Sequence, residues 1–255
     1  MQEVNISENN FEQCLKCNLC TTVCPMMAVN PNYPGPKQAG PDGERYRLKD
    51  PAFYDLTLKY CLNCKRCEVA CPSGVRIGDI IQTARLKYGR KSRPLRDRVM
   101  SDQDLLGNVA SHMAPAVNLI SSSRLVKSSL DAFGVVDRHR TLPRYSGDTF
   151  EDWFAGQDQS GYRRYVTYFH GCYVNYNNPG LGKELVRILN ACGYGVRLLD
   201  RENCCGAAMI TAGFGKKARR LAMTNVASIR KAVEAGDSVL TTGSTCAFIL
   251  RDEYE

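Results

Sequence analysis

Two groups of cysteines near the start of the chain share one regular spacing. Each group reads C-x2-C-x2-C-x3-C-P. The first consists of Cys14, Cys17, Cys20 and Cys24, and the second consists of Cys61, Cys64, Cys67 and Cys71. Two-residue spacers let three thiolates surround one compact inorganic core, and the fourth cysteine, followed by proline, reaches a core from elsewhere. The spacing therefore predicts two [4Fe–4S] clusters.

In two-cluster proteins with this motif, the fourth cysteine of each run binds the other cluster. The first cluster is therefore assigned to Cys14, Cys17, Cys20 and Cys71. The second cluster is assigned to Cys61, Cys64, Cys67 and Cys24. The alternative is zinc, which is commonly held by pairs of C-x2-C, and the two runs fit it poorly. The cations between the ligands are expected to solvate the loops rather than tune the potentials: Lys16, Lys65 and Arg66.

The other five cysteines lie in the last third of the chain, where strand and helix signals alternate. Strands are predicted at 165–169, 195–199 and 238–242, with helices over 181–192 and 218–233 between them. This βαβαβ pattern predicts a parallel sheet with right-handed crossovers. One or two cysteines follow each strand, namely Cys172, Cys204 with Cys205, and Cys246. Because the carboxyl ends of parallel strands share one edge, we expect these four thiols to meet there.

This second group of thiols can hold a third iron–sulfur cluster or a metal ion. Gly206 follows the adjacent cysteines and lets a bulky ligand approach the backbone. The alternative is inert thiols, since free cysteines are often small core residues, but the predicted convergence favours a ligand set. His170 is expected to be structural, although ligation or hydrogen bonding is open to it. Cys192 falls on the apolar face of a predicted helix and is expected in the core.

The surrounding elements give an α+β fold class. Prolines and glycines in the loop 30–43 argue against a regular helix or a central strand. Short helices over 51–60 and from Val75 to Leu86 would flank the second cysteine run. We expect three parts: a mostly helical, ferredoxin-like two-[4Fe–4S] domain over 1–92, a helical linker over 93–160, and an α/β cysteine-rich domain over 161–255.

The expected linker contains apolar positions at helical spacing, with a break near Pro115. Two of them, Leu125 and Phe133, belong to an amphipathic stretch. Core packing is the favoured role for these side chains, and a membrane-surface helix is the alternative.

Composition limits the compartment and the partners. The 13 cysteines, together with a polar and acidic start without a secretory signal, indicate a reducing cytosolic setting rather than a disulfide framework. No apolar run reaches the roughly 20 residues that cross a bilayer. Part of the net charge of +8 lies in residues 85–98. This stretch is expected to be a solvated helix end, or alternatively a patch for anionic lipid or an acidic partner. No nucleic-acid partner is expected, because no binding motif accompanies the charge.

Three longer segments are more specific than the cysteine runs: the loop from Pro31 to Arg45, the stretch from Tyr60 to Ser73, and the segment from Phe169 to Tyr176. With them the chain resembles the family of iron–sulfur subunits of anaerobic glycerol-3-phosphate dehydrogenases. The resemblance implies an electron-transfer subunit of anaerobic respiration and glycerol metabolism, peripheral on the cytoplasmic side of the inner membrane. Such a subunit passes electrons from flavin-containing catalytic subunits to menaquinone and anchors those subunits. It implies no catalytic residue here, and the sequence has no flavin or dinucleotide fingerprint.

The last third also resembles the cysteine-rich CCG domain of heterodisulfide reductase and succinate dehydrogenase relatives. That pattern ends in C-x2-C, but Gly243 stands at the first of these positions and only Cys246 remains. The resemblance further implies a second CCG domain, so the chain is expected to be a fragment or a truncated form. The alternative functions are an iron–sulfur reductase subunit of the heterodisulfide reductase or glycolate/lactate oxidase type, a reductase acting at Cys204 and Cys205, and a zinc-binding structural protein.

Overall fold

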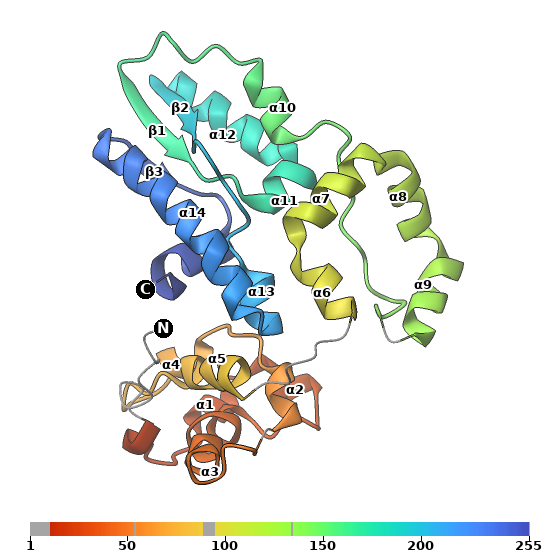
Figure 1. The fold of residues 1–255 in the computed structure, drawn as a ribbon, viewed down its shortest axis with the longest axis vertical. Helices are drawn as coiled ribbons and strands as arrows, with labels where there is room; N and C mark the ends of the chain where they lie inside the picture. Colours follow the sequence, from red (N-terminus) through yellow and green to blue (C-terminus); the bar gives the residue numbers. More distant parts are fainter. Residues whose placement is uncertain (1–10, 54, 89–94, 134, 255) are drawn as a thin grey trace. The chain divides into compact units, whose positions relative to one another are not determined.

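The computed structural model describes residues 11–53, 55–88, 95–133 and 135–254 (Figure 1). Contacts between residues divide the chain into two compact units. Unit 1 comprises residues 1–93 with 209–215, and unit 2 comprises residues 94–208 with 216–255. Nearly all of the segment expected to be a linker therefore belongs to unit 2.

Unit 1 is built from short helical pieces around one apolar core, as predicted. Its elements are η2 (Phe11–Gln13), α1 (Leu19–Thr22), α2 (Pro25–Val29), η3 (Gln38–Asp42), α3 (Gly43–Lys49), η4 (Leu56–Tyr60), α4 (Arg66–Val69) and α5 (Ile77–Lys87). The core includes Tyr33, Leu58 and Ile80, and the buried thiols of Cys20 and Cys67 are part of it. The predicted helix from Val75 to Leu86 is confirmed as α5, and the one over 51–60 is reduced to the 3-10 turn η4.

The loop 30–43, for which neither a regular helix nor a central strand was expected, has a helical second half. Its second half forms a π-helical turn, η3, with Pro41 inside it, and continues directly into α3. The backbone is held by Arg47, whose side chain is fully buried and donates to the carbonyls of Ala39 and Gly40 at 3.0 and 3.2 Å. The same guanidinium pairs with buried Glu44 at 2.7 Å. The turn therefore accommodates Pro41, because the buried guanidinium donates hydrogen bonds to carbonyl groups of the turn that precede the proline.

Unit 2 contains the predicted parallel sheet. Its strands are β1 (Arg164–Tyr168), β2 (Tyr194–Leu198) and β3 (Ser238–Leu240), in the order β2-β1-β3. The crossover helices are α12 (Pro179–Ala191) and α14 (Gly215–Glu234), close to the predicted ranges. Val166 of β1 pairs with Val196 of β2 and with Ser238 of β3, so the three strands end at one edge. The βαβαβ expectation is confirmed.

Several short helices of unit 2 were not predicted. They are α10 (Phe150–Ala155), α11 (Gly171–Tyr176), α15 (Ser244–Phe248) and η5 (Ile249–Glu253), and a further short helix, α13 (Ala207–Ala212), lies mostly in the segment 209–215 that belongs to unit 1. Thr149 and Asp152 form a reciprocal capping box that begins α10. Phe150 then enters the core against Tyr168 and Val186. Cys192 was wrongly placed in the core: α12 ends at Ala191, and Cys192 is exposed at its cap.

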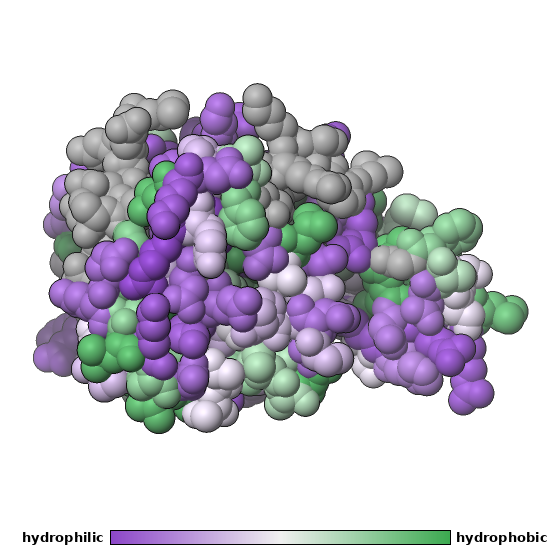
Figure 2. Space-filling view, turned by 90° about the horizontal axis from the view of Figure 1, so that it is seen from below, coloured by the Kyte–Doolittle hydropathy of each residue, from purple (hydrophilic) through white to green (hydrophobic). Residues whose placement is uncertain are grey.

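Several apolar side chains between Leu105 and Phe133 of the expected linker, for which core packing was favoured, are exposed instead. The segment forms α6 (Leu95–Ser101), α7 (Gln103–His112), α8 (Ala114–Ser122) and α9 (Arg124–Ala132), and the break near Pro115 is confirmed. Leu125 and Phe133 are each 82% exposed. On α7 the buried positions are small, and Gly107 lies directly against the ring of Tyr176. Because α7 packs closely through its small residues, its larger side chains lie on the outside. Figure 2 shows hydrophobic side chains exposed among hydrophilic ones on the face seen from below.

The basic stretch 85–98 and the expected absence of a membrane-spanning segment both concern contact with a membrane. Residues 89–94 of the basic stretch, like residues 1–10, lie outside the described part of the chain. Arg85 is not solvated, because its buried guanidinium donates to the carbonyl of Cys61 at 2.9 Å. Among the helices that the structure describes, none is long and apolar enough to cross a membrane.

Candidate metal centres

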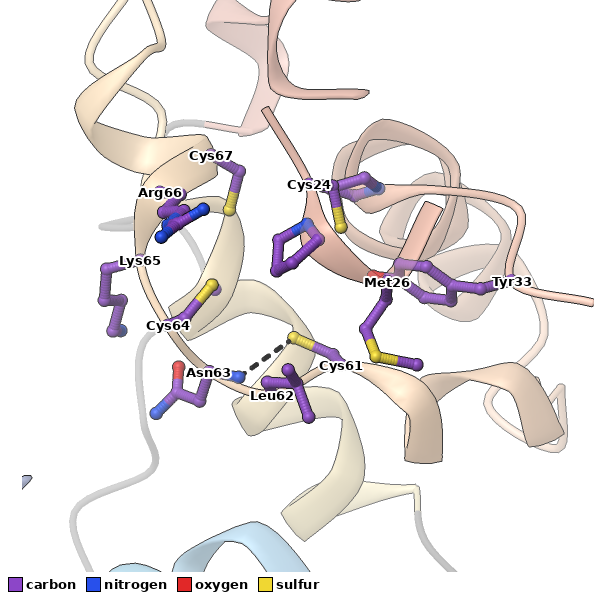
Figure 3. Close-up of a pocket in the computed structure, with 13 residues that line it drawn as sticks. Cys24, Met26, Tyr33, Cys61, Leu62, Asn63, Cys64, Lys65, Arg66 and Cys67 are labelled. Atoms are coloured by element: carbon purple, nitrogen blue, oxygen red, sulfur yellow. Dashed lines mark hydrogen bonds between the residues drawn. The ribbon is translucent and has the colours of Figure 1, made fainter. Parts of the chain in front are cut away.

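The eight cysteines of unit 1 line two separate cavities. We call site 1 the cavity with the thiols of Cys14, Cys17, Cys20 and Cys71. Site 2 is the cavity with the thiols of Cys24, Cys61, Cys64 and Cys67 (Figure 3). Each cavity therefore takes three cysteines from one run and the fourth from the other run. This grouping is the one that the crossed ligand assignment requires, and the assignment of thiolates to clusters stays a prediction.

The two cysteine runs have the same backbone shape. Each places two non-glycine residues in the left-handed region: Lys16 and Asn18 in the first run, and Asn63 and Lys65 in the second, with φ between 52° and 66°. This conformation costs about 1–3 kcal/mol for each residue. It wraps the chain tightly enough to bring three successive thiols to one cavity. The second residue of each pair then caps a single helical turn that carries the third cysteine.

Backbone amides point at two of the ligand sulfurs. The N–H of Asn63 donates to Sγ of Cys61 at 3.4 Å, and the N–H of Val75 donates to Sγ of Cys71 at 3.3 Å. Such donors stabilise negative charge on a thiolate. Burial works in the opposite direction and raises the pKa of Cys67 to about 12. Because iron binds the thiolate form, filling of site 2 must release protons.

Lys65, beside site 2, forms ion pairs, contrary to the expectation that it only solvates the loop. Lys65 follows Cys64 and pairs with both Asp79 and Glu68. Glu68 also accepts the backbone N–H of Asp79 at 3.1 Å, at the start of α5. This network joins the ligand loop to α5, so Lys65 is a structural cation of site 2.

The four cysteines at the sheet edge also come together, and we call this group site 3. Sγ of Cys204 lies 3.7 Å from Sγ of Cys172. Cys204 and Cys246 are also the neighbours that act on the pKa of Cys205, so the four thiols lie in one group. The hydrogen bond to Cys204 and burial together raise the pKa of Cys172. The predicted convergence at the strand ends is confirmed, whereas the binding of a cluster there stays a prediction.

Two glycines leave room for the sulfur of Cys246. A Cβ atom on Gly171, where φ is +72°, would lie 3.0 Å from this sulfur. A Cβ atom on Gly243 would lie 3.1 Å from it. Position 243 therefore lies directly beside site 3. With glycine instead of the cysteine of the CCG pattern at this position, the four thiols have no fifth thiol beside Cys246 from position 243.

His170 is a structural residue of site 3, as expected. Its ring lies between two carboxylates, with Nδ1 3.4 Å from Glu202 and Nε2 3.3 Å from Glu151. Burial disfavours the charged ring, but these carboxylates outweigh it and raise the pKa of His170. Glu202 accepts the N–H groups of Gly171 at 2.6 Å and of His170 at 3.3 Å. Burial also raises the pKa of Glu202 to about 7. This carboxylate therefore fixes the turn that leads to Cys172.

Three further side chains, none of them predicted from the sequence, hold the cysteine pair of site 3. Asp104 of α7 accepts the backbone N–H of Cys204 at 2.8 Å. The hydroxyl of Tyr254 donates to the carbonyl of Cys205 at 3.0 Å. Asn225 of α14 is fully buried. Its side chain accepts a hydrogen bond from the N–H of Asn203 and donates to the carbonyl of Asn203 and to the Tyr254 hydroxyl. No local motif marks these positions, because each acts from a distant part of the chain.

Comparison with known proteins agrees with this division into sites. Residues 10–75 match the 4Fe-4S dicluster domain, and residues 166–251 match the cysteine-rich CCG domain. The chain is an iron–sulfur protein with a dicluster domain and a CCG domain. Sites 1 and 2 lie in the dicluster match, and the thiols of site 3 lie in the CCG match.

Curated relatives carry both parts. A subunit of the anaerobic glycerol-3-phosphate dehydrogenase of Escherichia coli is 56% identical over 252 residues, which cover 98% of this chain and 64% of the relative. The glycolate oxidase iron–sulfur subunit of Escherichia coli is 26% identical, over 96% of this chain and 59% of that protein. A subunit of the fumarate reductase (CoM/CoB) of Methanothermobacter marburgensis is 26% identical, over 94% and 43%. The chain thus spans less than two thirds of each relative. No solved structure matches it.

The geometry of the iron–sulfur protein fits clusters at sites 1 and 2. Among the described residues, no three His, Cys, Asp or Glu side chains converge on a point where they could hold a single metal ion. The thiols instead surround cavities, with Cys17 and Cys64 exposed at the rims and Cys20 and Cys67 buried at the core. A soft, all-thiolate donor set around a cavity suits an iron–sulfur core.

Proposed function

We propose that this chain is the electron-transfer subunit of an anaerobic glycerol-3-phosphate dehydrogenase. The observation that carries the proposal is the presence of two crossed thiol sites and a third site in one chain, together with 56% identity to a subunit of that enzyme. Bound [4Fe–4S] clusters supply one-electron redox chemistry. The protein holds them through its thiolates and sets their surroundings through burial and hydrogen bonds.

In this proposal the substrate chemistry belongs to partner subunits. Flavin-containing subunits oxidise glycerol 3-phosphate to dihydroxyacetone phosphate, which releases two electrons and two protons. The electrons cross this chain singly and reduce menaquinone, which takes up two protons on becoming menaquinol. No residue of this chain acts on the substrate. Its contribution is to hold the relay sites at fixed positions inside each unit.

We also propose a peripheral position on the cytoplasmic side of the inner membrane, where the chain anchors its partners. Support comes from α8, α9 and the residue after α9, where Leu119, Leu125 and Phe133 are exposed at 76%, 82% and 82%. Arg124 and Arg138 are exposed in the same segment and would face anionic headgroups. Apolar side chains flanked by cations are the composition of an interfacial helix.

The test is co-purification under anaerobic conditions with the flavin-containing dehydrogenase subunits of the same organism, followed by glycerol 3-phosphate-dependent reduction of a menaquinone analogue. We expect a stable complex, bleaching of the cluster absorbance on addition of glycerol 3-phosphate, and quinone reduction only when this chain is present. Quinone reduction by the flavin subunits alone would contradict the proposal.

A second candidate is an iron–sulfur subunit of a glycolate/lactate oxidase or a heterodisulfide reductase-type enzyme. It is supported by the 26% identity over almost the whole chain to the glycolate oxidase iron–sulfur subunit. Electron donors separate the two candidates. Reduction of the clusters by glycolate with its cognate flavin subunits, and not by glycerol 3-phosphate, would favour the second.

A further inference from the structure

A tyrosine hydroxyl enters the site 2 cavity. Tyr33 is 2% exposed, and its side chain points into the space between Cys24 and Cys61 (Figure 3). A tight turn sets its position, because the N–H of Tyr33 donates to the carbonyl of Asn30 at 3.1 Å. Gly35 follows with φ +95°. The loop between the two cysteine runs thus places a buried phenol among the ligand thiols.

The Tyr33 hydroxyl lies beside the sulfur of Cys61 in this cavity, within reach of that sulfur as a hydrogen-bond donor. The same sulfur accepts the backbone N–H of Asn63 at 3.4 Å. Cys61 therefore accepts one backbone donor and lies beside a second donor, the Tyr33 hydroxyl, which a substitution can remove. A phenol with a pKa of about 10 or above remains a donor throughout the physiological pH range.

Site 1 is built differently. Its described lining includes Leu15, Asn18, Lys37 and Ile77, but no tyrosine. The groups beside Cys20 of site 1 are the Thr21 side chain and the backbone of Lys37, and Thr21 is only half-buried. The two sites share a ligand pattern and a backbone shape, so the buried phenol is a difference between otherwise similar surroundings.

Hydrogen bonds to cluster sulfurs favour the reduced, more negative state, and their effect is larger where water is excluded. We propose that Tyr33 is a tuning residue of site 2, which raises the reduction potential of that site selectively because its buried hydroxyl donates a hydrogen bond to the Cys61 sulfur when a cluster is bound. The inference rests on the proposed presence of a cluster at site 2. It makes the two relay positions energetically unequal without any difference in ligands.

The test is Tyr33→Phe in the anaerobically purified full chain, with both cluster potentials measured by redox titration under electron paramagnetic resonance. We expect one potential to fall, with a change of about tenfold in the one-electron equilibrium, or ~59 mV, and the other to stay constant. The matched control is Tyr60→Phe, because Tyr60 precedes Cys61 but does not line the cavity. Unchanged potentials with full iron content, or an equal shift in the control, would overturn the proposal.

A second variant covers the case in which Tyr33→Phe loses iron. Replacement of Tyr33 by 3-fluorotyrosine keeps the ring and the hydroxyl but makes the hydroxyl a stronger donor. We expect the same potential to rise. A constant or lower potential would show that Tyr33 only fills space. These measurements use the isolated chain, so failure of the proposed dehydrogenase role would appear as no reduction by flavin partners while the Tyr33 effect persists.

Discussion

The two groups of cysteines are assembled by different means. In unit 1, each three-cysteine run wraps itself around a cavity through two left-handed residues, and only the fourth thiol comes from the other run. In unit 2, the four thiols of site 3 come from the ends of three strands and meet only after the sheet has formed. A local site therefore depends mainly on its own spacing, whereas site 3 depends on register, on glycine contacts and on side chains from distant helices.

The largest expected effect tests the crossing in unit 1. Cys17→Ser removes a ligand of site 1, so about four of the eight irons of the dicluster unit should be lost, with one of its two paramagnetic signals. Cys71→Ser should remove the same signal, and Cys24→Ser the other. Cys192→Ser, at an exposed thiol outside all three sites, should change neither. Loss of the same signal in the Cys17 and Cys24 variants would contradict the crossed assignment.

The next effect tests how unit 1 supports its local motif. Arg47→Leu leaves the buried carboxylate of Glu44 without its cation, and breaking a buried pair costs about 3–5 kcal/mol. We expect this loss in the free energy of unfolding, measured by denaturant titration of cluster absorbance. The control is Arg187→Leu, whose exposed partner is Glu184 and which should cost less than about 1 kcal/mol. Equal losses would show that the buried pair has no special role.

A smaller effect tests the dependence of site 3 on close packing. Gly171→Ala combines a left-handed backbone with a Cβ atom 3.0 Å from Sγ of Cys246. We expect about 1–3 kcal/mol of destabilisation, together with a change in thiol reactivity or iron content that is confined to site 3. Gly236→Ala has a similar φ of +87° but no atom within 4 Å of the added carbon. It should show the backbone cost without an effect on site 3, and a shared effect would exclude the contact as its cause.

The smallest effect concerns a surface outside both cysteine groups. Replacing Leu125 and Phe133 together by serine should leave stability unchanged, because both side chains are exposed. If α9 lies at the membrane surface, binding to phosphatidylglycerol-containing vesicles should weaken about tenfold. Side chains that enter the headgroup region only in part lose a fraction of the roughly 1.5–3 kcal/mol that full burial of each provides. Flotation measures the affinity, and Ser128→Ala on the same helix is the control. Unaltered flotation of the double variant would remove α9 from the proposed anchor.

Much of the fold follows from local patterns. The periodicity of Val75 to Leu86 and of the residues around α12 and α14 predicts helices, since an apolar face repeats with the helical turn. Alternation of strands and helices predicts the parallel sheet, because such crossovers leave few other arrangements. Spacing likewise predicts the eight ligand thiols of unit 1. These features depend on neighbours along the chain.

The errors share a different cause. Leu125 and Phe133 have a core-like pattern, but whether an apolar face is covered depends on what packs against it. The turn around Pro41 is helical because Arg47, six residues later, satisfies its carbonyl groups from inside the fold. Cys192 lies one residue beyond the end of its helix. Local sequence does not encode these partners.

The types and spacing of the cysteines by themselves determine that the chain binds iron–sulfur clusters in its first third, because a run of three ligands needs only a few backbone angles to close on one cavity. Tertiary structure alone decides that Tyr33 enters site 2, and that Glu202, Asp104 and Tyr254 hold site 3. These groups act across tens of residues, and their positions become defined only when the helices and the sheet pack together.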